Sequence, residues 1–369
     1  MKRSSGLRSV PLVVAASIAF CSTSSYAGVT GVAGESQVRI TQFHGTTAVQ
    51  SDFSTEIVPS TKPEPPAIAR GRLDRVLVNN DVVAAGQGVA IMYAPNLSGS
   101  GNPNDIGIDV GAFTDGTDKN TSWVSTATVK QTRSLLVSPG ELGLQFGTSS
   151  ARIRNRILLS GIMIVSSEEL TRDLTGVDVH FAFNLFRRQD GRDVAMPITG
   201  EIALVGGPGG SVTVQRRAGA LNNIVIPVID LNAAIPSSPL VKAILFDGAE
   251  LFYEYDVTLN QPYELELSAT ATVKTVPGGV GALATFGTPS EGLASIFDRV
   301  KKDDSGQRLI AAINQRVDTT GLKYVNNPAP FPGLSSMCGS MGTLTIFMMF
   351  VAGCTSAARI RRRRRSRGG

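Results

Sequence analysis

Strict alternation of apolar and polar residues is the main pattern of this chain. Its clearest example is the stretch from Tyr263 to Lys274, where Leu265, Leu267, Ala269, Ala271 and Val273 share one side with Tyr263. A period of two is that of a half-buried strand, because successive side chains point to opposite faces of a sheet. We therefore predict a strand over 263–274 with its apolar side in the core. Residues 251–259 are predicted to pair with it through a tight turn at Asn260-Gln261-Pro262.

The same alternation predicts further strands. One directs Val177, Val179, Phe181, Phe183 and Leu185 inward and ends in a turn at Gln189-Asp190-Gly191. Two shorter strands, 201–205 and 211–217, flank the glycine-rich turn 206–210. No internal repeat stands out along the chain. Short strands separated by turns, without helices between them, favour a mainly β fold, an antiparallel β-sandwich or jelly roll.

One region has helical spacing instead. Residues 288–291 provide an N-terminal cap, a proline in the first turn and a glutamate three residues on. Apolar residues then recur every three or four positions, at Leu293, Ile296, Phe297 and Val300. We predict an amphipathic helix to about Lys302 and a second short helix over 310–317. We expect this segment to pack on the sandwich, with a membrane surface or a partner protein as the alternative.

The N-terminus has the three parts of a secretory signal. Lys2, Arg3 and Arg8 precede an uncharged apolar stretch, 10–21, that is too short to span a bilayer. Ser25-Tyr26-Ala27 then offers small residues at the positions that a signal peptidase reads. We therefore predict cleavage after Ala27 and export of the protein.

The C-terminus carries a second apolar run. Residues 334–358 contain no charged side chain, and as a helix they would extend roughly 37 Å, enough for a hydrocarbon core about 30 Å thick. A basic cluster follows, and such clusters stay on the cytoplasmic side of a membrane. This stretch is therefore predicted to be a transmembrane span that leaves the body outside, stopped by Arg361, Arg362, Arg363, Arg364 and Arg365.

A proline motif stands directly before that span. Pro328-Ala329-Pro330, followed by Phe331-Pro332-Gly333, then the span and the arginine cluster, resembles the tripartite PEP-CTERM sorting tails of bacterial proteins. The tail departs from that pattern in having alanine where glutamate is usual, and an extra Phe-Pro before the glycine. Pro63-Glu64-Pro65 spells the usual motif but has no span after it.

The resemblance implies a bacterial protein of the cell surface or extracellular matrix. It implies signal peptidase and an exosortase-like protease as partners, with Pro328, Ala329 and Pro330 as the processing motif. A simple membrane anchor is the alternative use of the same tail. The run 251–286 also resembles the closing strands of β-sandwich domains that precede such tails. The predicted organisation is a signal peptide, a β-sandwich ectodomain, a helical segment with linker, and a sorting tail: 1–27, 28–286, 287–326 and 327–369.

Removing the two ends changes the charge and cysteine content. Three of the 35 Lys and Arg residues lie in the signal and seven lie at the C-terminus, so residues 28–327 hold 25 basic against 30 acidic residues. A mildly acidic body lacks the basic face that nucleic-acid binding requires. All three cysteines, Cys21, Cys338 and Cys354, also lie in the ends. The body therefore has neither a disulfide framework nor a thiolate site.

No catalytic constellation emerges from the body. Its two histidines, His44 and His180, come with no Gly-x-Ser-x-Gly elbow. Paired carboxylates of a glycosidase would have to come from Glu168, Glu169, Glu250, Glu254, Glu264 and Glu266. The stretch 96–120 is predicted to be a long exposed loop.

Calcium is the cofactor to consider for the predicted loop 96–120, because carboxylate and amide oxygens are its usual ligands. The loop contains five such residues: Asn104, Asp105, Asp109, Asp115 and Asp118. The spacing matches no EF-hand, so we assign no metal, no cofactor and no catalytic residue. We predict a non-enzymatic structural or interaction module, with an extracellular polysaccharide as a candidate ligand. The alternatives are a secreted polysaccharide-acting hydrolase and a calcium-dependent adhesin or lectin.

Overall fold

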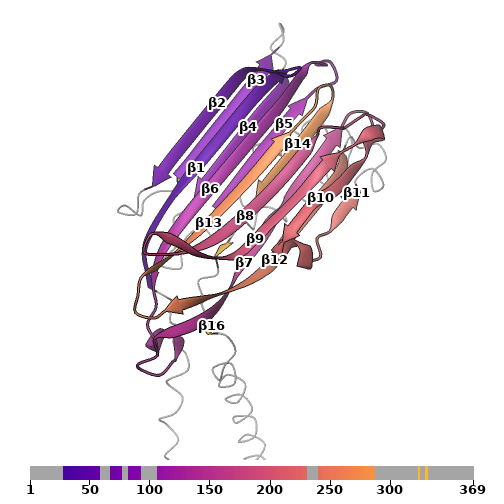
Figure 1. Ribbon diagram of the computed structural model, residues 1–369. Coiled ribbons are helices and arrows are strands. Elements are labelled where there is room, and N and C mark those ends of the chain that lie inside the picture. The colour runs from indigo at the N-terminus through magenta and orange to yellow at the C-terminus, as the bar shows by residue number, and fades with distance from the viewer. Residues whose placement is uncertain are drawn as a thin grey trace, which may run out of the picture.

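Figure 1 shows the computed structural model, which describes residues 28–58, 67–76, 82–92, 106–230, 240–286, 323–324 and 329–330. Within these ranges the chain consists of antiparallel strands joined by turns and by three short 3-10 helices, Gly140–Leu142, Pro208–Gly210 and Ala220–Asn223. The predicted mainly β, antiparallel fold is confirmed. The predicted signal peptide, the helices after residue 287 and the C-terminal span lie outside the described residues.

The strands form two sheets. Sheet A has the order β10-β9-β8-β13-β6-β1-β2. Its members are β1 (Gly28–His44), β2 (Thr47–Val58), β6 (Thr121–Leu136), β8 (Asp178–Gln189), β9 (Arg192–Gly206), β10 (Val212–Gly219) and β13 (Tyr263–Lys274).

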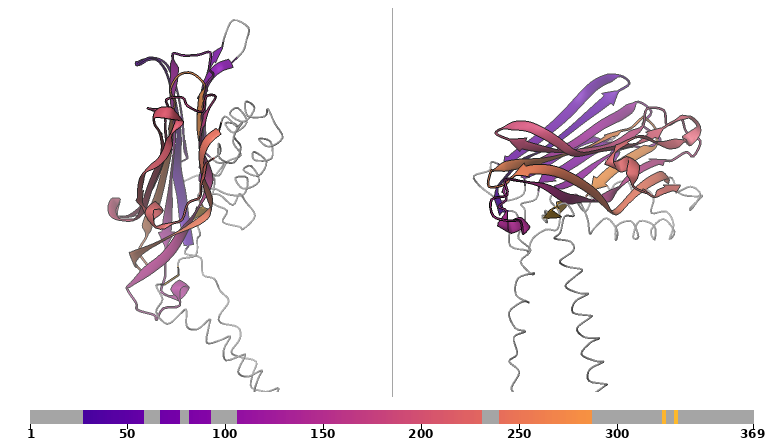
Figure 2. Two further views of the ribbon diagram at one scale, coloured as in Figure 1. Left: turned by 90° about the vertical axis from the view of Figure 1, so that its right-hand side faces the viewer. Right: turned by 60° about the horizontal axis from the view of Figure 1, so that its bottom comes forward.

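Sheet B has the order β11-β12-β7-β14-β5-β4-β3. Its members are β3 (Ala67–Val76), β4 (Val82–Met92), β5 (Ile106–Thr114), β7 (Ser150–Ser167), β11 (Val228–Asp230), β12 (Leu240–Thr258) and β14 (Val280–Phe286). Two short strands, β15 (Lys323–Tyr324) and β16 (Ala329–Pro330), also pair with β7. The two sheets stack face to face as two layers (Figure 2), which gives a sandwich-like arrangement.

The core lies between the layers and follows the predicted alternation. Leu267 and Phe183 are completely buried, and Leu265 is 2% exposed. Phe181 of sheet A stacks on Phe286 of sheet B with 3.9 Å between the ring centroids, so aromatic contacts join the two layers. The predicted inward faces of β8 and β13 are therefore confirmed.

The predicted hairpin between 251–259 and 263–274 is wrong. β12 pairs with β7 in sheet B, whereas β13 pairs with β6 and β8 in sheet A. The turn at 260–262, with Asn260 at φ 60°, therefore carries the chain from one layer to the other. Alternation shows which side of a strand is buried, but it does not reveal which strand lies alongside.

The turn between β8 and β9 is as predicted. Asp190 and Gly191 have φ of 52° and 72°, the left-handed pair of a two-residue type I′ turn. This turn suits the right-handed twist of an antiparallel pair, and β8 and β9 pair directly up to Gln189 and Arg192.

The long loop predicted over 96–120 is wrong in its centre. Residues 106–114 form β5, which is buried at all nine positions and lies between β4 and β14. Glycine and aspartate gave this stretch the composition of a loop, but small residues there allow close packing in a strand that is covered on both faces. Residues 96–105 lie outside the described residues.

Candidate functional site

The predicted processing motif adjoins the folded body at β7. Ala329 and Pro330 form β16, antiparallel to β7, with Ala329 opposite Arg154 and Pro330 opposite Ile153. Pro328 lies outside the described residues, as do the predicted cleavage residue Ala27 and the cluster Arg361 to Arg365. The described part of the motif is thus extended and placed at the margin of sheet B.

Charged residues of β7 and β12 surround this position on the outer face of sheet B. The guanidinium of Arg156 lies 2.6 Å from a carboxylate oxygen of Glu250, and that of Arg152 lies 3.1 Å from Glu254. The guanidinium carbon of Arg154 lies 4.8 Å from the centre of the Phe252 ring. Exposed pairs of this kind contribute little to stability, typically about 0–1 kcal/mol.

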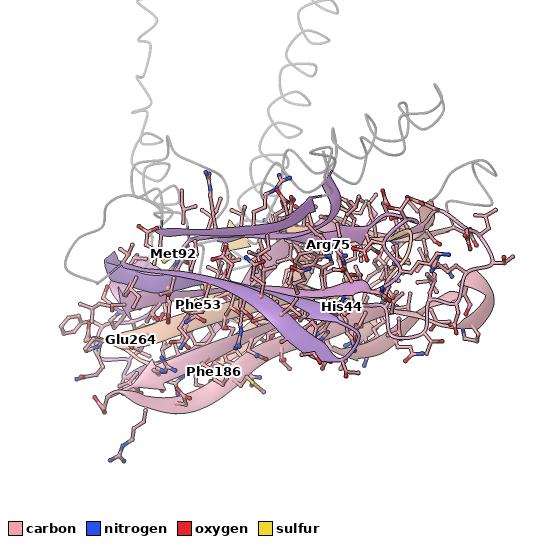
Figure 3. All side chains as sticks on the ribbon, turned by 90° about the horizontal axis from the view of Figure 1, so that it is seen from above. His44, Phe53, Arg75, Met92, Phe186 and Glu264 are labelled. Carbon is pink, nitrogen blue, oxygen red and sulfur yellow. The ribbon has the colours of Figure 1, made fainter. Side chains whose placement is uncertain are left out.

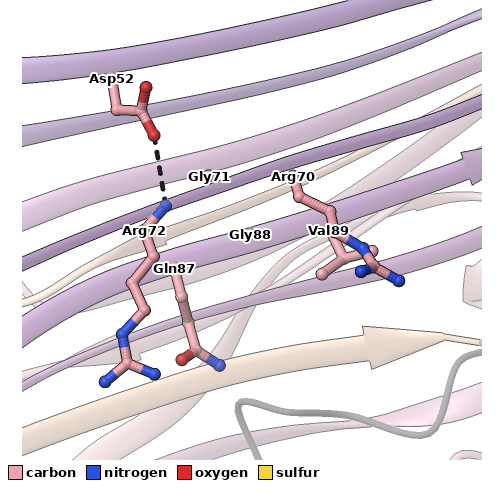
Figure 4. Close-up of a pocket in the computed structure, with 7 residues that line it drawn as sticks. All are labelled: Asp52, Arg70, Gly71, Arg72, Gln87, Gly88 and Val89. Carbon is pink, nitrogen blue, oxygen red and sulfur yellow. Dashed lines mark hydrogen bonds between the residues drawn. The ribbon is translucent and has the colours of Figure 1, made fainter.

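A pocket of about 240 Å³ lies at the opposite margin of the sandwich, where β2 meets β3 (Figure 4). Its lining comes from β2, β3 and β4: Asp52, Arg70, Gly71, Arg72, Gln87, Gly88 and Val89.

Two carboxylates of β2 close the sandwich at this margin. The backbone N–H of Arg72 donates to Asp52 at 3.2 Å, and the backbone N–H of Ile68 donates to Glu56 at 2.7 Å. β3 is the edge strand of sheet B, and its outward amides would otherwise lack partners in the sheet. Acidic side chains of the neighbouring sheet satisfy two of them, those of Ile68 and Arg72.

The same pocket does not fit the hydrolase alternative. Asp52 is its only carboxylate, whereas glycosidases use two carboxyl groups flanking the bond that is cleaved. The Arg72 guanidinium is hydrogen-bonded to Asp74 at 2.8 and 2.9 Å. Two of the three charged residues that line the pocket, Asp52 and Arg72, are therefore engaged in contacts within the fold.

The fold divides four of the carboxylates considered for a glycosidase between the two outer faces. Glu250 and Glu254 lie on the outer side of sheet B, whereas Glu264 (labelled in Figure 3) and Glu266 lie on the outer side of sheet A. Although it lies on the outer side, Glu266 is only 4% exposed. It is buried because Arg188 binds it through two nitrogens and Lys130 lies 3.4 Å away. The structure brings no pair of the four together across the layers.

The two histidines also lie apart. His44 is exposed at the end of β1 (Figure 3), and His180 lies on the outer face of β8 with its Nε2 3.0 Å from Glu201 Oε1. Glu201 belongs to the neighbouring strand β9. His180 is therefore part of a cross-strand surface pair.

Two of the acidic residues considered for calcium, Asp115 and Asp118, hold local backbone structure, whereas Asn104 and Asp105 lie outside the described residues. Asp115 accepts a hydrogen bond from the Thr117 backbone at 2.7 Å, and Asp118 accepts from the Asn120 and Thr121 backbones at 3.1 and 3.0 Å. Asp118 also pairs with Arg75 at 2.9 Å. Among the residues that the structure describes, no group of three or more candidate ligands could hold a metal ion.

The structure contains a buried polar cluster on β6 that was not predicted from the sequence. Arg133 is 1% exposed on the inner side of β6 and donates to Gln131 at 3.0 Å. Nearby, burial raises the pKa of Tyr263 to about 12, and its hydroxyl lies 3.4 Å from that of Tyr255. The available signal was a charged residue in phase with apolar ones, since Arg133 continues the series of Ala127 and Val129.

Comparison with known proteins does not assign the chain to a family. No family model and no curated protein matches the chain. Among solved structures, the infectious bursal disease virus VP2 subviral particle aligns with 81% of this chain and 76% of its own, at 13% identity and a TM-score of 0.11. A score this low carries no argument. In the described part of the chain, no helix has the length and apolar character needed to cross a membrane.

Proposed function

We propose that the protein is an exported bacterial cell-surface or extracellular-matrix protein. Its β-sandwich ectodomain acts as a non-enzymatic structural or interaction module, and its C-terminal tail is a sorting signal processed by an exosortase-like protease. The observation that carries the proposal is the tripartite order of motif, apolar run and arginine cluster in residues 328–367.

Two features of the described body are compatible with this assignment. The carboxylates that a hydrolase would use are divided between the two outer faces, and Glu254, His180 and Glu266 each pair with a neighbouring charged residue. Ala329 and Pro330 of the proline motif pair with β7 of the folded body. A protease that acts there would separate the tail from an intact sandwich.

The test replaces Pro328 and Pro330 with alanine in the full chain and follows the tail in the native host. We expect export to continue and the tail to be retained in the membrane fraction, because an extended proline motif suits a protease groove. The matched control replaces Pro63 and Pro65, which spell the usual motif far from any span, and should leave processing unchanged. Equal processing of both variants would refute the assigned motif.

A further inference from the structure

The strand order of the two sheets repeats with a period of seven strands. In sheet A, the run β2-β1-β6 on one side of the centre matches β9-β8-β13 on the other. In sheet B, β4-β5-β14 matches β11-β12-β7 in the same way. Each strand thus corresponds to the one seven places away, and only β3 and β10 differ, as edge strands of different sheets. A pseudo-two-fold axis through the centre of both layers relates the halves.

The central strands of sheet A carry the same repeat in their sequence. Residues 126–130 on β6 and 270–274 on β13 both read TATVK. The strands are antiparallel neighbours, and Ala127 lies opposite Ala271. The hydroxyls of Thr126 and Thr272 are 3.1 Å apart, as are those of Thr128 and Thr270. A local two-fold axis through the Ala127–Ala271 pair relates these two threonine contacts to each other.

β14, the last strand of the second repeat, is much shorter than its counterpart β7 in the first. β7 has 18 residues, whereas its counterpart β14 has seven. β12 pairs with β7 from Ser150 to Ser166 along one edge, but β14 pairs with the other edge only from Ile162 to Ser167. Twelve residues of β7, 150–161, therefore present an edge on which a further strand can pair.

The chain's own C-terminal segment lies on that edge. Lys323 and Tyr324 pair with Leu158 and Ile157, and Ala329 and Pro330 pair with Arg154 and Ile153. Since β12 occupies the opposite edge of β7, β14, β15 and β16 follow one another along the same side, all antiparallel to β7. Together they supply the strand that the repeat requires.

We propose that residues 150–161 of β7 form a strand-accepting slot, and that β15 (Lys323–Tyr324) and β16 (Ala329–Pro330) dock there and withhold Ala329 and Pro330 of the proline motif from proteolysis. This regulation rests on the proposed sorting function of the tail. Proteases that bind extended peptides pair with the peptide backbone, and β16 already uses that backbone against β7. The motif must leave the slot before it is cut.

The docked strand is suited to reversible release. β15 and β16 have two residues each, and Pro330 has no backbone N–H to donate. Short terminal elements with few backbone hydrogen bonds open locally at low cost while the rest of the fold stays intact. Undocking therefore exposes the motif without unfolding the sandwich.

Cysteine pairs test the docking directly, because the body has no native cysteine. In the full chain with Cys21→Ser, Cys338→Ser and Cys354→Ser, Ala329→Cys is combined with Arg154→Cys, whose native side chain is exposed. The control combines Ala329→Cys with Arg39→Cys on β1 of sheet A. We expect mild oxidation to close an intramolecular disulfide in the first pair and none in the control. Equal crosslinking of both pairs, or of neither, would overturn the slot.

A soluble proline-specific endopeptidase then tests the withholding. It is added to the detergent-solubilised full chain, and mass spectrometry follows the release of fragments that begin after Pro330. Release should be lost while the disulfide is closed and restored after its reduction; equal release in both states rules out the protective role. Neither assay uses the host protease. If the parent chain keeps its tail in the host, the sorting function fails while the crosslink still decides the docking.

Discussion

Truncating Leu267 tests the arrangement of the core most simply. This side chain is completely buried on the inner face of β13, opposite Gln131 of β6 and Leu185 of β8. Leu267→Ala removes three carbon atoms, which corresponds to roughly 2.4 kcal/mol of lost transfer free energy at about 0.8 kcal/mol each. The residual cavity adds about 24 cal/mol per Å³, so the total should fall at roughly 2 to 5 kcal/mol.

Urea unfolding of the full chain measures this loss, read as a lower midpoint at an unchanged slope. The matched control is Ser268→Ala, the next residue, whose side chain points to the outer face. Its effect should stay within about 0.5 kcal/mol, as is usual for surface substitutions. If Leu267→Ala were no more destabilising than Ser268→Ala, the faces of β13 would be inverted, because a shift of one residue exchanges them.

Two further perturbations follow from the described residues. Burial raises the folded-state pKa of Tyr263 to about 12, so the free energy of unfolding should fall by roughly 3 kcal/mol as the pH rises from about 10 to about 12. Tyr263→Phe should remove that decline in unfolding measurements, and an unchanged pH dependence in the variant would contradict it. The repeat predicts equal coupling for the Thr126–Thr272 and Thr128–Thr270 pairs, about 0.2–1 kcal/mol each, and double-mutant cycles with alanine that found one pair coupled and the other not would contradict it.

The alternation of apolar and polar residues predicted the strands that have one buried face and one solvent-exposed face. The boundaries of β13 and the turn after β8 follow from side-chain alternation and from the Asp190-Gly191 pair. β5 escaped this reasoning because it is covered on both faces, so its residues need not alternate, and its glycines and aspartate are typical of loops. The pairing of β12 with β7 was not predicted either, because the two strands lie about 90 residues apart and the sequence around each strand does not identify such a distant partner.

The candidate site likewise has one part that the sequence predicted and one part that only the structure shows. The order of motif, span and arginines is a property of the sequence itself, and it alone suggested a sorting tail. That Ala329 and Pro330 pair with β7 depends on a contact across some 175 residues of chain. The seven-strand repeat likewise became visible through the strand order, because only five residues of the central strands preserve it in sequence. Arg133 lies inward because Gln131 provides a polar partner there.

Intact-mass measurement of the mature protein from the native host tests the sorting account most directly. If the tail is a sorting signal, the mature chain in the surface or secreted fraction begins at Gly28 and lacks everything after the proline motif, including Arg361 to Arg365. A mature chain that begins at Gly28 and still ends at Gly369, with its arginines retained in the membrane fraction, would contradict it and establish a permanent anchor.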